Sequence, residues 1–113
     1  NKENGSQLVT GVTIVRSDFL KENEEAVKLF IEDHKASAAY TSEHLDEAAE
    51  MVAALGIVEK APIAKKAMPA CNIVCITGEE MKSALSGYLS VLEAADAKSV
   101  GGQLPADDFY YPP

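Results

Sequence analysis

The stretch over residues 71–81, CNIVCITGEEM, is the part of the sequence that most constrains the fold. Its first half is an apolar run with the length of a buried strand, and its second half changes to helical spacing. Thr77 and Glu80 have the spacing of a capping box, in which the two side chains satisfy free N–H groups at the start of a helix. The pattern therefore predicts a buried strand over residues 73–76 that leads directly into a helix.

A second strand is predicted over residues 8–15, LVTGVTIV, which are rich in β-branched side chains. Both faces of this run carry apolar residues, which is typical of a strand inside a sheet. Two strands make a poor sheet by themselves, because independent stability usually needs more of them. The sequence thus predicts interior strands without edge strands, and this indicates a chain that is part of something larger or that pairs with another copy.

Helices are predicted for most of the remaining chain. Apolar residues at helical spacing predict a long helix over residues 24–41, and a second helix that starts at Leu45 and ends before Gly56. A shorter helix over residues 59–68 accommodates Pro62 in its first turn. A fourth helix is predicted directly after the strand over residues 73–76.

The expected fold class is therefore α/β, helix-rich, with about four helices and two strands of an incomplete sheet. The length of 113 residues suits a single domain over residues 1–113, and an apolar content of 47% is enough for a core. The net charge of −8 disfavours nucleic acid and anionic membrane surfaces as partners, because an acidic surface repels phosphate groups. No apolar run approaches the roughly 20 residues of a membrane-spanning helix.

Of the two cysteines, Cys71 lies just before the strand predicted over residues 73–76 and Cys75 lies within it. In an extended strand their Cα atoms would lie roughly 13 Å apart, whereas a disulfide allows about 7 Å. No histidine lies near them in sequence, so they also make a poor zinc site. We expect both to be buried, unreactive thiols that behave as small apolar residues.

No catalytic or cofactor motif occurs in the sequence. The nucleophile elbow, the phosphate-binding loop, the dinucleotide-binding glycine motif and the zinc-binding His-Glu-x-x-His are all missing. We therefore expect no enzymatic activity, no cofactor and no metal. His34, beside the apolar stripe of the long helix, is either a ligand contact or a half-buried packing residue, and the packing interpretation is favoured. Asp107 and Asp108 are interpreted as a turn or cap rather than as a carboxylate pair.

Two segments offer backbone amides and small polar side chains that a ligand could approach. The first is the loop of Gly5, Ser6 and Gln7, which precedes the first predicted strand. The second is the start of the other strand, at Cys71 and Asn72. These five residues are the predicted ligand-binding residues, although purely structural loops have the same composition.

Three stretches carry a family resemblance that extends over nearly the whole chain. They are residues 5–20, GSQLVTGVTIVRSDFL, the helix pair from residues 24–30 to residues 46–50, and residues 67–82, AMPACNIVCITGEEMK, which are followed by a closing DFYY at residues 108–111. Together they resemble the C-terminal part of substrate-binding proteins of ABC importers. The most similar group is the nitrate/sulfonate/taurine and thiamine-precursor type, with the periplasmic-binding-protein type II fold.

The resemblance implies a bacterial solute receptor outside the cytoplasm, in the periplasm or anchored to the cell surface as a lipoprotein. Such a receptor captures a small solute, here a nitrate, a sulfonate or a thiamine-precursor-like molecule, and delivers it to an ABC permease in the membrane. Because such proteins bind solute between two lobes, the resemblance also implies that this chain is a C-terminal fragment with little binding of its own. The alternative is a self-contained helical interaction module that forms a homodimer through its unpaired strands.

Overall fold

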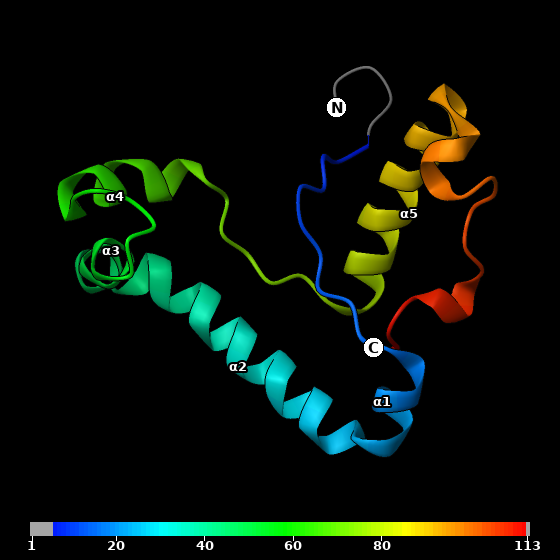
Figure 1. Cartoon of the computed structure of the whole chain (residues 1–113), viewed down its shortest axis with the longest axis horizontal. Helices are drawn as coiled ribbons and strands as arrows, with labels where there is room; N and C mark the ends of the chain where they lie inside the picture. Colours follow the sequence, from blue (N-terminus) through cyan, green and yellow to red (C-terminus); the bar gives the residue numbers. More distant parts are fainter. Residues whose placement is uncertain (1–5, 113) are drawn as a thin grey trace. The chain divides into compact units, whose positions relative to one another are not determined.

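The computed structural model describes residues 6–112, and this part of the chain is helical (Figure 1). The chain runs through the elements α1 (Ser17–Glu22), α2 (Glu24–Glu43), α3 (Leu45–Ala54), α4 (Ala61–Ala67), η1 (Met68–Ala70), α5 (Gly78–Ala95), η2 (Ala97–Val100) and η3 (Asp107–Phe109), where η marks a short 3₁₀-helix. No strand occurs between residues 6 and 112. The predicted α/β fold class, with two strands of an incomplete sheet, is therefore wrong.

The chain divides into two compact units. Unit 2 is the continuous stretch over residues 15–75, which contains α1 to α4 and η1. Unit 1 combines residues 1–14 with residues 76–113 and contains α5, η2 and η3.

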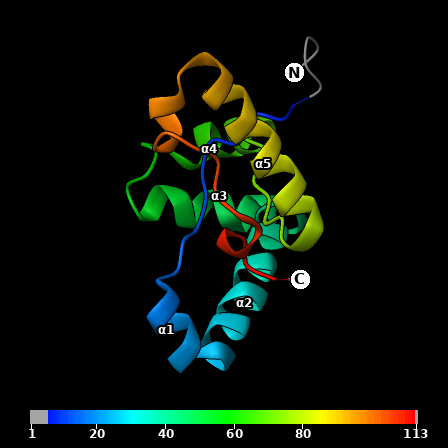
Figure 2. The same cartoon turned by 90° about the vertical axis from the view of Figure 1, so that its right-hand side faces the viewer.

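The core of unit 2 lies between α3 and α4. Ala48 and Ala49 of α3, Ala64 of α4 and Met68 of η1 are all buried. Half-buried side chains pack around this cluster, and they are Tyr40, Leu45, Val52 and Val58. Because three of the four buried residues are alanines, the two helix backbones can approach each other closely, and Met68 supplies the one large side chain. Figure 2 shows α3 and α4 side by side, and α1 folded back beside the start of α2.

The helices of unit 2 agree closely with the sequence prediction. Helix α2 covers the predicted long helix and continues to Glu43, with Glu24 and Glu25 in its first turn, where the helix dipole favours negative charge. Helix α3 begins at Leu45, as predicted. Helix α4 begins at Ala61 with proline in its first turn, where the missing N–H would have had no helical partner.

Unit 1 is built on α5, which begins where the sequence predicted a helix but without the predicted capping box. Thr77 is the N-cap residue, yet its side chain accepts no hydrogen bond from the first turn. The next residue, Gly78, has a φ angle of 66°, which glycine adopts without steric cost. This left-handed residue gives the backbone at the start of α5 a different path from the one that a capping box requires.

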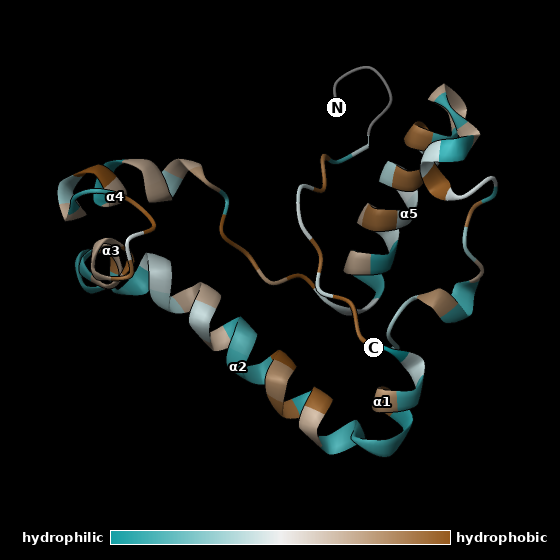
Figure 3. Cartoon of the chain, in the orientation of Figure 1, coloured by the Kyte–Doolittle hydropathy of each residue, from teal (hydrophilic) through white to brown (hydrophobic). Residues whose placement is uncertain are grey.

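The two predicted strands are stretches of coil. Residues 8–15 and 73–76 have no regular secondary structure, and Figure 3 shows strongly hydrophobic coil in both stretches. Their large side chains are largely exposed, with 83% of Ile14 and 62% of Val74 accessible to solvent. The β-branched side chains of these stretches favour a strand. A strand also needs a second backbone segment that accepts and donates its hydrogen bonds. No such ladder forms within residues 6–112, and dimerisation of two copies through these segments stays a prediction.

Candidate functional site

The predicted ligand-binding residues fall into both units. Gly5 lies outside the described residues. Ser6 is half-buried and Gln7 is exposed in unit 1, whereas Cys71 and Asn72 are exposed in unit 2. None of these four residues lines either of the two hollows described below. Their role in ligand binding therefore stays a prediction.

The cysteines differ from the prediction of two buried thiols. Both are free, Cys71 is exposed and Cys75 is half-buried. The Cys71 thiol donates a weak hydrogen bond to the carbonyl oxygen of Ala67, 3.3 Å away. The prediction was wrong because it rested on a buried strand, and coil at this place leaves the thiols uncovered.

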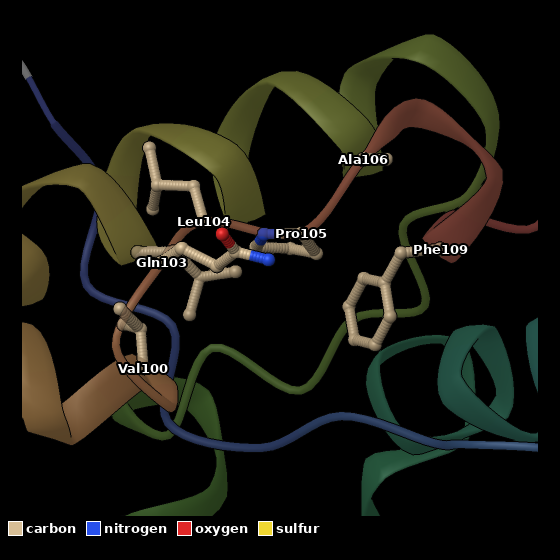
Figure 4. Close-up of a pocket in the computed structure, with 7 residues that line it drawn as sticks. Val100, Gln103, Leu104, Pro105, Ala106 and Phe109 are labelled. Atoms are coloured by element: carbon tan, nitrogen blue, oxygen red, sulfur yellow. The ribbon is translucent and has the colours of Figure 1, made fainter.

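A shallow hollow of about 260 Å³ lies in unit 1 (Figure 4). It is lined by Leu89 of α5, Val100 of η2 and the returning chain at Gln103, Leu104, Pro105, Ala106 and Phe109. Gly101, with a φ angle of 80°, ends η2 in the left-handed conformation and turns the chain back. The Gln103 amide is the one polar side chain among these seven residues. The hollow can accept a small apolar group, but it offers no acid, base or nucleophile.

In unit 1, Lys82 of α5 contacts the segment that follows η2. The Lys82 Nζ atom lies 3.3 Å from Asp107 Oδ1 and 5.9 Å from the centre of the Tyr110 ring. Asp107 begins the short helix η3, which agrees with its interpretation as part of a turn rather than as half of a carboxylate pair. The lysine thus combines an ion pair with a cation–π contact, both at the surface.

A polar cluster closes the corner between α2 and α3 in unit 2. The Tyr40 hydroxyl donates a hydrogen bond to Glu47 Oε2 at 2.5 Å, and Glu47 Oε1 lies 3.9 Å from His44 Nδ1. The Tyr40 and His44 rings stack with their centres 4.5 Å apart. Lys65 of α4 pairs with Asp46 at 2.6 Å. These contacts lie around a second shallow hollow and join three helices.

This corner cluster was missed by the sequence reasoning, although its spacing was visible. Tyr40, His44 and Glu47 are separated by four and three residues, which places them on one side of a helical turn. All its members carry exposed polar atoms, and no group of three or more metal-binding side chains occurs anywhere in the described part of the chain. The cluster is therefore interpreted as a structural tie at the helix corner.

The Tyr40 phenol ionises at a raised pH because of its contact with Glu47. The hydrogen bond to Glu47 raises the pKa of Tyr40 above the ordinary value of 10.0, with small further contributions from burial and from the Glu47 charge. A raised pKa in the folded protein means that this contact stabilises the fold below the ordinary tyrosine pKa and is lost as the pH rises through the raised value. Ultraviolet titration of the wild type and of the Glu47→Gln variant measures this, and the ionisation of Tyr40 should move to lower pH in the variant. An unchanged titration curve would contradict the contact.

His34 is half-buried on α2, and its ring packs edge-on against Phe30 with the ring centres 5.7 Å apart. The half-buried position and the ring contact agree with the packing interpretation, and a ligand contact at His34 stays a prediction.

No family model, curated protein or solved structure matches this chain. Within residues 6–112, no helix combines the length and the apolar character needed to cross a membrane.

Proposed function

We propose that this chain is part of the solute-binding component of an ABC importer, which acts outside the bacterial cytoplasm. In this role the complete protein captures a small solute, such as a nitrate, a sulfonate or a thiamine precursor, and delivers it to a membrane permease. The proposal rests on the sequence resemblance over nearly the whole chain. The helical fold of the chain departs from the α/β lobes of that family. The structural support for the proposal is the exposed apolar surface of the chain.

The chain leaves a large apolar surface exposed to solvent. Among residues 6–112 the buried apolar residues are only Val27, Ala48, Ala49, Ala64 and Met68, although 47% of the sequence is apolar. Large side chains in both units are mostly exposed, with 75% of Leu8 and 75% of Leu55 accessible to solvent. Soluble proteins rarely expose so many large apolar side chains unless other protein covers them. This supports a role as part of a larger receptor whose remaining chain supplies the cover.

The proposal predicts that the chain alone binds solute weakly or not at all. Titration calorimetry of the chain against nitrate, taurine and a pyrimidine should give no saturable heat, because the residues that line the cleft would lie mostly in the other part of the receptor. The product of the longer reading frame that includes this chain should bind one of these solutes with saturable heat and close around it by a hinge motion.

Three outcomes would count against the proposal in different ways. Tight binding by the chain alone would contradict its role as a minor contributor to the cleft. A longer product that binds none of the solutes, or the lack of a longer reading frame, would contradict the receptor function itself. Dimer formation by the chain in sedimentation experiments, without solute binding by the longer product, would favour the alternative of a helical interaction module.

A further inference from the structure

The segment between η1 and α5 holds the only two cysteines of the chain, and both are accessible. Cys71 is exposed, Cys75 is half-buried, and both are free thiols. The single hydrogen bond that the Cys71 thiol donates, to Ala67, is of a weak kind and does not fix the side chain. Access to solvent is the first requirement for thiol oxidation, and both cysteines meet it.

The backbone between the cysteines can bend without loss of secondary structure. Residues 72–77 form neither helix nor strand, so no ladder of hydrogen bonds keeps Cys71 and Cys75 at the spacing of a strand. Asn72 has a φ angle of 51°, in the left-handed region that serves tight turns. Cys71 and Cys75 are four residues apart. An α-turn closes positions i and i+4 through one hydrogen bond, and a disulfide needs Cα atoms about 4.4–6.8 Å apart.

We propose that Cys71 and Cys75 are a redox-sensitive thiol pair that closes into an intramolecular disulfide. With oxidised glutathione as the oxidant, the more exposed Cys71 thiolate attacks one glutathione sulfur, forms a mixed disulfide and releases one glutathione thiolate. The Cys75 thiolate then attacks the Cys71 sulfur, which forms the internal disulfide and releases the second glutathione. The two protein thiols lose their protons to the two released glutathione thiolates, and one oxidised glutathione is reduced to two glutathiones.

The disulfide would act on a connection between the two units. The boundary between unit 2 and unit 1 lies directly after Cys75, so closing the five-residue loop fixes the last part of unit 2 before the chain enters unit 1. Oxidation would reduce the conformational freedom of this connection, because a disulfide removes the extended conformations of the segment that it closes.

Mass spectrometry of the native protein after incubation with oxidised glutathione tests the proposal. We expect the monomer to lose about 2 Da, the mass of two hydrogens, and its free thiols to fall from two to none. The matched variants Cys71→Ser and Cys75→Ser should each stop at one stable glutathione adduct. Persistent double glutathione adducts in the wild type, or covalent dimers on a non-reducing gel in place of the internal disulfide, would overturn the proposal.

The left-handed backbone at Asn72 is tested by its own matched pair of variants. Asn72→Gly keeps the left-handed conformation accessible, whereas Asn72→Val disfavours it because of its β-branched side chain. Internal disulfide formation should therefore be slower in Asn72→Val than in Asn72→Gly when both are followed by mass. Equal rates would overturn the assignment of the left-handed Asn72 backbone as the feature that lets the cysteines come together.

Discussion

Replacement of Met68 by alanine should lower the free energy of unfolding by about 2 kcal/mol. Met68 is only 9% exposed and is the largest side chain in the buried cluster with Ala48, Ala49 and Ala64. Its loss leaves a space that the neighbouring alanines are too small to fill. We expect a value near the lower end for a Met→Ala change because the cluster is small and lies close to the surface. Urea unfolding followed by the circular dichroism of the helices measures the change.

The control for this experiment is Met51→Ala in α3. Met51 is 53% exposed, so the same chemical change should alter the free energy of unfolding by no more than about 0.5 kcal/mol. Equal losses in the two variants would mean that Met68 is not a core residue of unit 2.

Replacement of Ala64 by leucine should destabilise unit 2 by about 1–3 kcal/mol. Ala64 is 1% exposed and faces the alanines of α3, so the larger side chain fits only if α3 and α4 move apart. Thermal unfolding followed by circular dichroism should show a lower midpoint for the variant.

Ala67→Leu provides the comparison within the same helix, because Ala67 is exposed. Both variants add the same side chain to α4, so any difference between them reports the packing against α3. If Ala64→Leu unfolds at the same temperature as Ala67→Leu or higher, close packing of α3 on α4 at this position would be refuted.

The helices of this chain could be predicted from the sequence because their signals are local. Apolar spacing and the proline in the first turn of α4 depend on neighbours within one or two turns of the same chain. The start of α5 shows the limit even there. Thr77 and Glu80 have the right spacing for a capping box, but the left-handed Gly78 between them changes the geometry on which that box depends.

The strands could not be predicted reliably because a strand is not a local structure. The runs at residues 8–15 and 73–76 have the composition of buried strands, and the composition says nothing about whether a pairing partner exists. The error spread to the candidate site, since the buried state of Cys71 and Cys75 was derived from the strand. The corner cluster of Tyr40, His44 and Glu47 escaped notice for another reason: spacing alone does not distinguish a polar tie from ordinary surface residues.

The division of the chain into units also sets an order for folding during synthesis. Unit 2 is one uninterrupted stretch over residues 15–75, so all of its contacts can form as soon as this stretch has left the ribosome. Unit 1 combines residues from before and after it, and its first segment must wait until α5 has been made. Vectorial synthesis should therefore complete unit 2 first. Until α5 has been made, the apolar coil before α1 has no later segment of unit 1 to contact, and its large side chains stay mostly exposed even in the folded chain, at 75% for Leu8.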